Sequence, residues 1–166
     1  TLIFSNEQKI EFKNLKIKSL PEIFTLLNEV KLNTYFEAGH TVRRVLTCPV
    51  NGLDDTQLFD VEPLANKLND TFIGNKNFEN LPNKLQIAIS GYEEGCNVQF
   101  TPDVSFNAMK DSKDKIIFAI KILDSFIGFI TPAQVVKTAT AIANLYKDFG
   151  ERSDESKSSF EYLVKS

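Results

Sequence analysis

The chain has 166 residues, which suits one compact domain with a small appendage, and 42% of them are hydrophobic. A net charge of −3, with no Lys/Arg-rich stripe among interleaved aromatic residues, argues against nucleic-acid binding. The longest apolar run, residues 116–130, is broken by Lys121 and Asp124, so no membrane span is expected.

The first predicted elements are a strand and a helix, which together make a small βα unit. Residues 8–17 alternate between apolar and charged side chains, which is the period of a half-buried strand. Ser19 and Glu22, with Pro21 between them, form the pattern of a capping box and predict that a helix starts there. The apolar face of this helix is expected to consist of Ile23, Phe24, Leu27 and Val30.

The middle of the chain alternates between predicted strands and helices. Residues 41–50 predict a strand that runs into a turn, and residues 85–89 predict a short buried strand that ends near Gly91. Between these strands, Asp60 is expected to cap a helix that stops at Gly74.

The last third of the chain predicts two strands and a long helix. Residues 104–108 and 116–123 have the composition of strands, and a charged loop joins them. Thr131, with Gln134 in the box position, predicts a helix start, and residues 160–164 predict a final helical turn. The mixture of short strands and helices places the chain in the α+β class.

Six groups of motifs keep their order along the chain: residues 20–24, 41–54, 59–65 with 68–70 and 74–75, 80–86, 89–91, and 102–104. Together they resemble the sirohaem and [4Fe–4S] nitrite/sulfite reductase family. In that family the second group reads VRNVTACPLAGVD, the fourth NLPRKFK, and the fifth begins VSGCPDNC. The resemblance implies a ferredoxin-like half-domain over 1–36. A sirohaem/4Fe-4S-type α/β sandwich domain over 37–166 would follow, as the degenerate first of two pseudo-symmetric repeats.

The resemblance also implies a site for an anion. These enzymes pass six electrons to nitrite or sulfite, and both the substrate and the carboxylate-rich sirohaem need cationic partners. It assigns Arg43, Lys84 and Gln86 to the catalytic site, and Arg43, Arg44 and Lys84 to cofactor binding. For Arg43 and Lys84 the alternative is an ordinary solvated charge, and for His40 the alternatives are a proton donor or a turn residue. The choice between nitrite and sulfite stays open.

The cysteines do not suffice for a cluster. A [4Fe–4S] cluster needs four thiolates, which the family supplies as C-x5-C and C-x3-C. Here Cys48 has no second cysteine within six residues, and Tyr92 takes the first position of the second motif, so only Cys96 remains. We therefore expect no metal ligands in this chain and two buried free thiols, with a cluster shared between two chains as the alternative. So few cysteines also favour a cytoplasmic protein.

Three positions depart from the family pattern by losing an arginine. Glu7 stands in the N-terminal motif, and Glu155 and Ser159 stand in the C-terminal one. A carboxylate beside a polyanionic cofactor is costly unless it is paired. We therefore expect that sirohaem and the [4Fe–4S] cluster belong to the full enzyme and that this chain alone binds neither.

Two functions remain open from the sequence. The first is the N-terminal half of a ferredoxin-dependent nitrite/sulfite reductase, whose oxidoreductase activity requires a second half that supplies the cluster cysteines. That half would lie on the same parent chain or on a separate subunit. The alternative is a decayed, non-catalytic half-repeat that acts as a scaffold or as a homodimeric interaction module.

Overall fold

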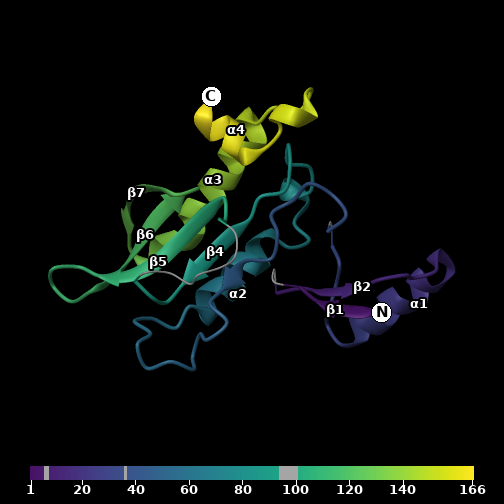
Figure 1. Ribbon diagram of the computed structural model, residues 1–166, viewed down its shortest axis with the longest axis horizontal. Coiled ribbons are helices and arrows are strands. Elements are labelled where there is room, and N and C mark those ends of the chain that lie inside the picture. Colours follow the sequence, from purple (N-terminus) through teal and green to yellow (C-terminus); the bar gives the residue numbers. More distant parts are fainter. Residues whose placement is uncertain (6–7, 36, 94–100) are drawn as a thin grey trace. The chain divides into compact units, whose positions relative to one another are not determined.

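The computed structural model describes residues 1–5, 8–35, 37–93 and 101–166. The chain divides into two compact units, Thr1–Tyr35 and Phe36–Ser166. Figure 1 shows a small first unit and a larger second unit built around a sheet.

The first unit is a hairpin followed by a helix. Strand β1 (Leu2–Phe4) pairs antiparallel with β2 (Ile10–Phe12), and a 3-10 turn, η1 (Ile17–Ser19), leads into α1 (Leu20–Glu29). The predicted strand is therefore confined to the centre of its range, and β1 was not predicted because three residues are too few to show a period. The helix start is confirmed, but Ser19 lies in the preceding turn and its side chain makes no cap.

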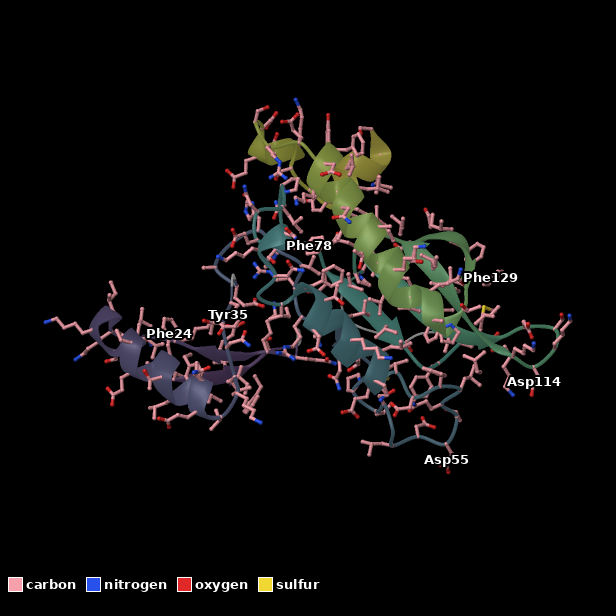
Figure 2. The ribbon with its side chains drawn as sticks, turned by 180° about the vertical axis from the view of Figure 1, so that it is seen from behind. Phe24, Tyr35, Asp55, Phe78, Asp114 and Phe129 are labelled. Atoms are coloured by element: carbon pink, nitrogen blue, oxygen red, sulfur yellow. The ribbon has the colours of Figure 1, made fainter. Side chains whose placement is uncertain are left out.

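No described residue of the first unit is buried. Its exposed large apolar residues are Leu2, Ile3, Phe4, Ile10, Phe12, Leu15, Ile17, Phe24, Leu26, Val30, Leu32 and Tyr35. Figure 2 shows Phe24 on α1 and Tyr35 near the end of the unit. A two-stranded hairpin with one helix is too small to enclose a core of its own.

The second unit is built on a five-stranded mixed sheet of order β3-β4-β5-β6-β7. The strands are β3 (Leu46–Thr47), β4 (Ile87–Ser90), β5 (Val104–Lys110), β6 (Ile116–Ile122) and β7 (Ser125–Ile130). The first three run parallel, and the last three form an antiparallel meander. Strand β7 was not predicted as a separate strand because it continues the apolar run of β6 across a two-residue turn.

Helices α2 (Glu62–Phe72) and α3 (Val135–Phe149) pack on one face of this sheet (Figure 1). Shorter elements are the 3-10 turns η2 (Lys76–Phe78), η3 (Pro132–Gln134) and η4 (Glu155–Lys157), and the final helix α4 (Phe160–Lys165). The predicted box of Thr131 and Gln134 is confirmed, because Gln134 accepts a hydrogen bond from the Thr131 N–H (2.9 Å). Asp60 lies one residue before the expected capping position, which Val61 occupies, although its carboxylate accepts a hydrogen bond from the first helical N–H, that of Glu62 (3.0 Å). The shared core includes Leu68, Phe72, Ile87, Phe106, Phe118, Ala139 and Tyr146.

The predicted strand over 41–50 is interrupted by one extra residue. Val42 bridges Leu85, whereas Leu46 pairs with Ala88, so four steps along one strand face three along the other. The extra residue leaves backbone groups without a partner in the sheet, and one of them, the Val45 N–H, donates to Asn69 Oδ1 at 2.9 Å. Only residues 46–47 therefore keep strand geometry in that range.

Candidate functional site

The bridge between Val42 and Leu85 brings two of the predicted site segments together. The Arg43 N–H donates to the Leu85 carbonyl at 2.9 Å, and both bridging side chains are fully buried. Since side chains alternate along extended backbone, Arg43, Lys84 and Gln86 leave on the side away from the core. The residues that the sequence assigned to one site thus lie on the two adjoining segments that lead into β3 and β4.

The guanidinium of Arg43 is held by the chain segment just before it. Its Nη1 donates to the Glu37 carboxylate at 2.9 Å and to the Glu37 carbonyl at 2.6 Å, while Nη2 donates to the Gly39 carbonyl at 3.1 Å. The Arg43 side chain is only 13% exposed. Its charge is therefore already matched by a carboxylate of the same chain, which the sequence did not predict.

Arg44 and Lys84 present cations to solvent. Both are exposed, and neither forms an ion pair with another residue in the described ranges. Gln86 is half-buried, and its amide Nε2 donates to the carbonyls of Arg44 (3.1 Å) and Ile87 (3.2 Å). The Gln86 amide thus donates to backbone carbonyls at the irregular strand, next to Arg44 and Lys84.

Asp103 is a site residue to which the sequence assigned no role. Its carboxylate accepts a hydrogen bond from the Gln86 N–H at 2.7 Å, and its carbonyl accepts one from the Leu123 N–H at 2.9 Å. Burial raises the pKa of Asp103, and the Gln86 hydrogen bond and the Lys84 charge offset this only in part. The motif over residues 102–104 was the signal that could have identified it.

The described residues do not fit a [4Fe–4S] cluster. Cys48 is buried but disulfide-bonded, so the expectation of a free thiol is wrong there, and Cys96 lies outside the described residues. The Tyr92 hydroxyl, where the family motif places a cysteine, donates to the Val50 carbonyl at 3.1 Å. Across the described ranges, no group of three or more His, Cys, Asp or Glu could hold a metal ion.

The positions that lost an arginine contribute no cation. Glu155 lies exposed in η4, and Ser159 caps α4 by accepting a hydrogen bond from the Tyr162 N–H at 3.1 Å. Glu7 lies outside the described residues. His40 is exposed, and its carbonyl accepts from the Leu81 N–H. For sirohaem, whose carboxylates need cations, Arg44 and Lys84 fit this need, whereas Arg43 fits it only if it exchanges Glu37 for the cofactor.

The fold defines an α+β protein in which cations flank an irregular strand. Residues 38–166 match the family model described as the nitrite and sulphite reductase 4Fe-4S domain, so the chain belongs to the nitrite and sulphite reductase family. No helix of the described residues has the length and apolar character needed to cross a membrane.

The family's curated members are much longer than this chain. The ferredoxin–nitrite reductase of Synechococcus elongatus is 28% identical over 96% of this chain and 34% of its own length. The ferredoxin sulfite reductase of Mycobacterium tuberculosis is 23% identical over 99% of this chain and 31% of its own length. The chain thus spans about a third of the relatives it matches.

A solved structure confirms the predicted α+β fold. The Mycobacterium tuberculosis NirA protein matches 99% of this chain and 32% of its own chain, with a TM-score of 0.88 and 22% sequence identity. At that identity the likeness concerns the fold.

Proposed function

We propose that this chain is the N-terminal half of a ferredoxin-dependent nitrite/sulfite reductase and that it acts only with a second half. In this proposal residues 1–36 are a ferredoxin-like half-domain and residues 37–166 the first sirohaem-type repeat. The second half supplies the cluster thiolates, and ferredoxin supplies electrons.

The observation that carries the proposal is the exposed apolar surface of the first unit. Ile17 is 85% exposed and Phe4 76% exposed, and none of the unit's described residues is buried. Exposed apolar area of this extent favours burial against a partner. The partner that fits is the remainder of such a reductase, which includes the proposed second half, because the relatives carry about twice this chain's length beyond the matched third.

The second support is the placement of Arg44 and Lys84. When bound, sirohaem and its cluster would relay the electrons of ferredoxin to the anion. This chain's part is to pair carboxylates and to hold the anion, which two exposed cations beside one irregular strand can do. Arg43 takes part if it releases Glu37, and Gln86 orients the strand between the cations.

The alternative, a decayed and non-catalytic scaffold or homodimeric module, also has an observation in its favour. The Arg43 guanidinium is occupied by Glu37, and the Tyr92 hydroxyl is bonded to the loop at Val50. Both contacts complete the fold without a cofactor.

An absorption spectrum distinguishes the reductase from the non-catalytic scaffold. We expect the native protein, or this chain mixed with its cysteine-bearing half, to show a sirohaem absorption band after anaerobic reconstitution. Replacing both Arg44 and Lys84 by alanine should weaken sirohaem retention about a hundredfold, because two charge-assisted contacts of about 1.5 kcal/mol each are lost. Lys113 and Lys115 in the β5–β6 hairpin are matched exposed lysines whose double alanine variant should bind normally. A preparation with no haem band under any of these conditions contradicts the proposed reductase function and favours the non-catalytic scaffold or homodimeric module.

A further inference from the structure

Asp103 connects the site to the parallel part of the sheet. It precedes β5, and its Oδ2 accepts from the Gln86 N–H at 2.7 Å just before β4. The next residue also binds Gln86, since the Val104 N–H donates to the Gln86 carbonyl at 3.2 Å. The backbone of Gln86 is therefore fixed from both sides by residues 103 and 104.

The charged and titratable groups that act on Asp103 come from three parts of the chain. Lys84, two residues before Gln86, attracts its carboxylate, Glu161 on α4 repels it, and the charge of Asp103 raises the pKa of Tyr146 on α3. Glu161 is itself paired with Lys165, at 2.5 Å between Oε1 and Nζ. Lys84 is thus the only unpaired cation among the groups that act on Asp103 in the described part of the chain.

We propose that Asp103 is a positioning residue of the anion site, which fixes the Gln86 backbone and aims the Lys84 ammonium. The inference rests on the proposed function, in which Lys84 meets the anion. A neutral acceptor would also satisfy the Gln86 N–H, but through a weaker hydrogen bond than the 2.7 Å one to the carboxylate. That hydrogen bond places the carboxylate charge two residues from Lys84 along the chain, and Lys84 is the cation that this charge attracts.

The pH dependence of stability separates this role from a structural one. Folding raises the pKa of Asp103, so its contribution to stability is complete below about pH 4 and is lost as pH rises through the raised value. At pH 7 the ionised carboxylate therefore costs folding free energy. A group that costs stability and yet serves a site is typical of functional residues.

Asp111 in the β5–β6 hairpin is a matched control. Its carboxylate also accepts backbone hydrogen bonds, from the N–H groups of Lys113 (2.8 Å) and Lys115 (2.9 Å). The Lys115 and Lys113 hydrogen bonds lower the pKa of Asp111, so its stabilising contribution is present above about pH 4 and is lost as pH falls through the lowered value.

The first experiment measures urea unfolding and the Gln86 amide resonance in this chain. At pH 7 we expect Asp103→Asn to unfold at the same or a higher urea concentration than the wild type, and Asp111→Asn at a lower one. The Gln86 amide should titrate in the wild type, with a midpoint above the ordinary aspartate range, and should not titrate in Asp103→Asn. An Asp103→Asn variant as destabilised as Asp111→Asn would show that Asp103 is structural and would overturn the inference.

The second experiment measures KM and kcat for nitrite, and for sulfite in parallel, in the reconstituted reductase. We expect Asp103→Asn to raise KM about tenfold. Lys84→Ala should do the same, and the double variant should be no worse than Lys84→Ala, because Asp103 acts through Lys84. Additive effects overturn the inference. An unchanged KM in Lys84→Ala overturns the proposed function instead, and the Gln86 titration then shows whether Asp103 still fixes that backbone.

Discussion

Arg43 holds the segment that follows the first unit. Its guanidinium makes three hydrogen bonds to Glu37 and Gly39, and its backbone N–H joins the bridge to Leu85. One residue therefore links residues 37–39 to the sheet of the second unit. A planar fork of donors suits this task, since it reaches a carboxylate and two carbonyls at once.

Replacing Arg43 by alanine should lower the free energy of unfolding by about 2 kcal/mol, because a charged, mostly buried group with three acceptors is removed. Arg43→Lys should lose less, since it keeps the charge but not the fork. Urea unfolding measures the stability, and amide exchange at residues 37–39 should become faster in both variants. Arg44→Ala is the control, because Arg44 is exposed and unpaired within the described residues. If Arg43→Ala and Arg44→Ala lowered the free energy of unfolding equally, the hydrogen bonds of Arg43 to Glu37 and Gly39 would not stabilise the fold.

The loop between Cys48 and Asp60 is fastened to the end of β4. The Leu58 N–H donates to the Gly91 carbonyl at 2.9 Å, and Gln57 Nε2 donates to the Phe59 carbonyl at 2.8 Å. A Cβ added at Gly91 would lie 2.1 Å from the Phe59 carbonyl oxygen, so only glycine permits this approach. The loop and the strand end form one tightly packed element.

Gly91→Ala should therefore destabilise the second unit by about 2 kcal/mol, because the loop must move away from β4. Gly128→Ala in β7 is the matched control. A Cβ there meets nothing within 4 Å, and the backbone φ of Gly128 is not among the positive ones. Its effect should stay within about 0.5 kcal/mol. Urea unfolding compares the two variants, and a tolerated Gly91→Ala would show that the loop is not fastened there.

Local patterns were sufficient for the helices and for strands β4, β5 and β6. Periods of 3.6 residues and capping residues such as Asp60 and Thr131 act within one turn, so the sequence displays them directly. Strands β1 and β3 depend on pairing with distant partners and are too short to show a period. The extra residue near Arg44 shows only in the register against β4.

The candidate site shows the same difference between local patterns, which the sequence displays, and long-range contacts, which it does not. The motifs brought Arg43, Lys84 and Gln86 to one region, but the sequence did not show which charges are already paired. The choice of Glu37 as the partner of Arg43 depends on how residues 37–39 turn back toward the sheet. The role of Asp103 depends on β4 and β5 lying side by side, which is a long-range contact.

At the scale of the whole chain, the two units differ in whether each has a hydrophobic core of its own. The second unit has a continuous core between its sheet and helices, drawn entirely from its own residues. The first unit has no buried residue among those described. The relatives are about three times as long as this chain, and we propose that their additional length covers the apolar side chains of the first unit.

This difference predicts how the chain behaves without a second half. We expect the full chain to bind a hydrophobic dye and to self-associate in sedimentation, because its first unit exposes apolar side chains such as Ile17 and Phe24. A chain of residues 37–166 should lose most of both properties and still unfold cooperatively, since it keeps the core.

Charge substitutions in the full chain provide the control for that truncation. Ile17→Lys with Phe24→Lys should reduce association as the truncation does, while Leu53→Lys, at an equally exposed position of the second unit, should not. Both variants leave the core untouched, so a change in association cannot come from unfolding. If the full chain sediments as a monomer that binds no dye, its first unit is complete without a partner, and the need for a second half loses its main physical support.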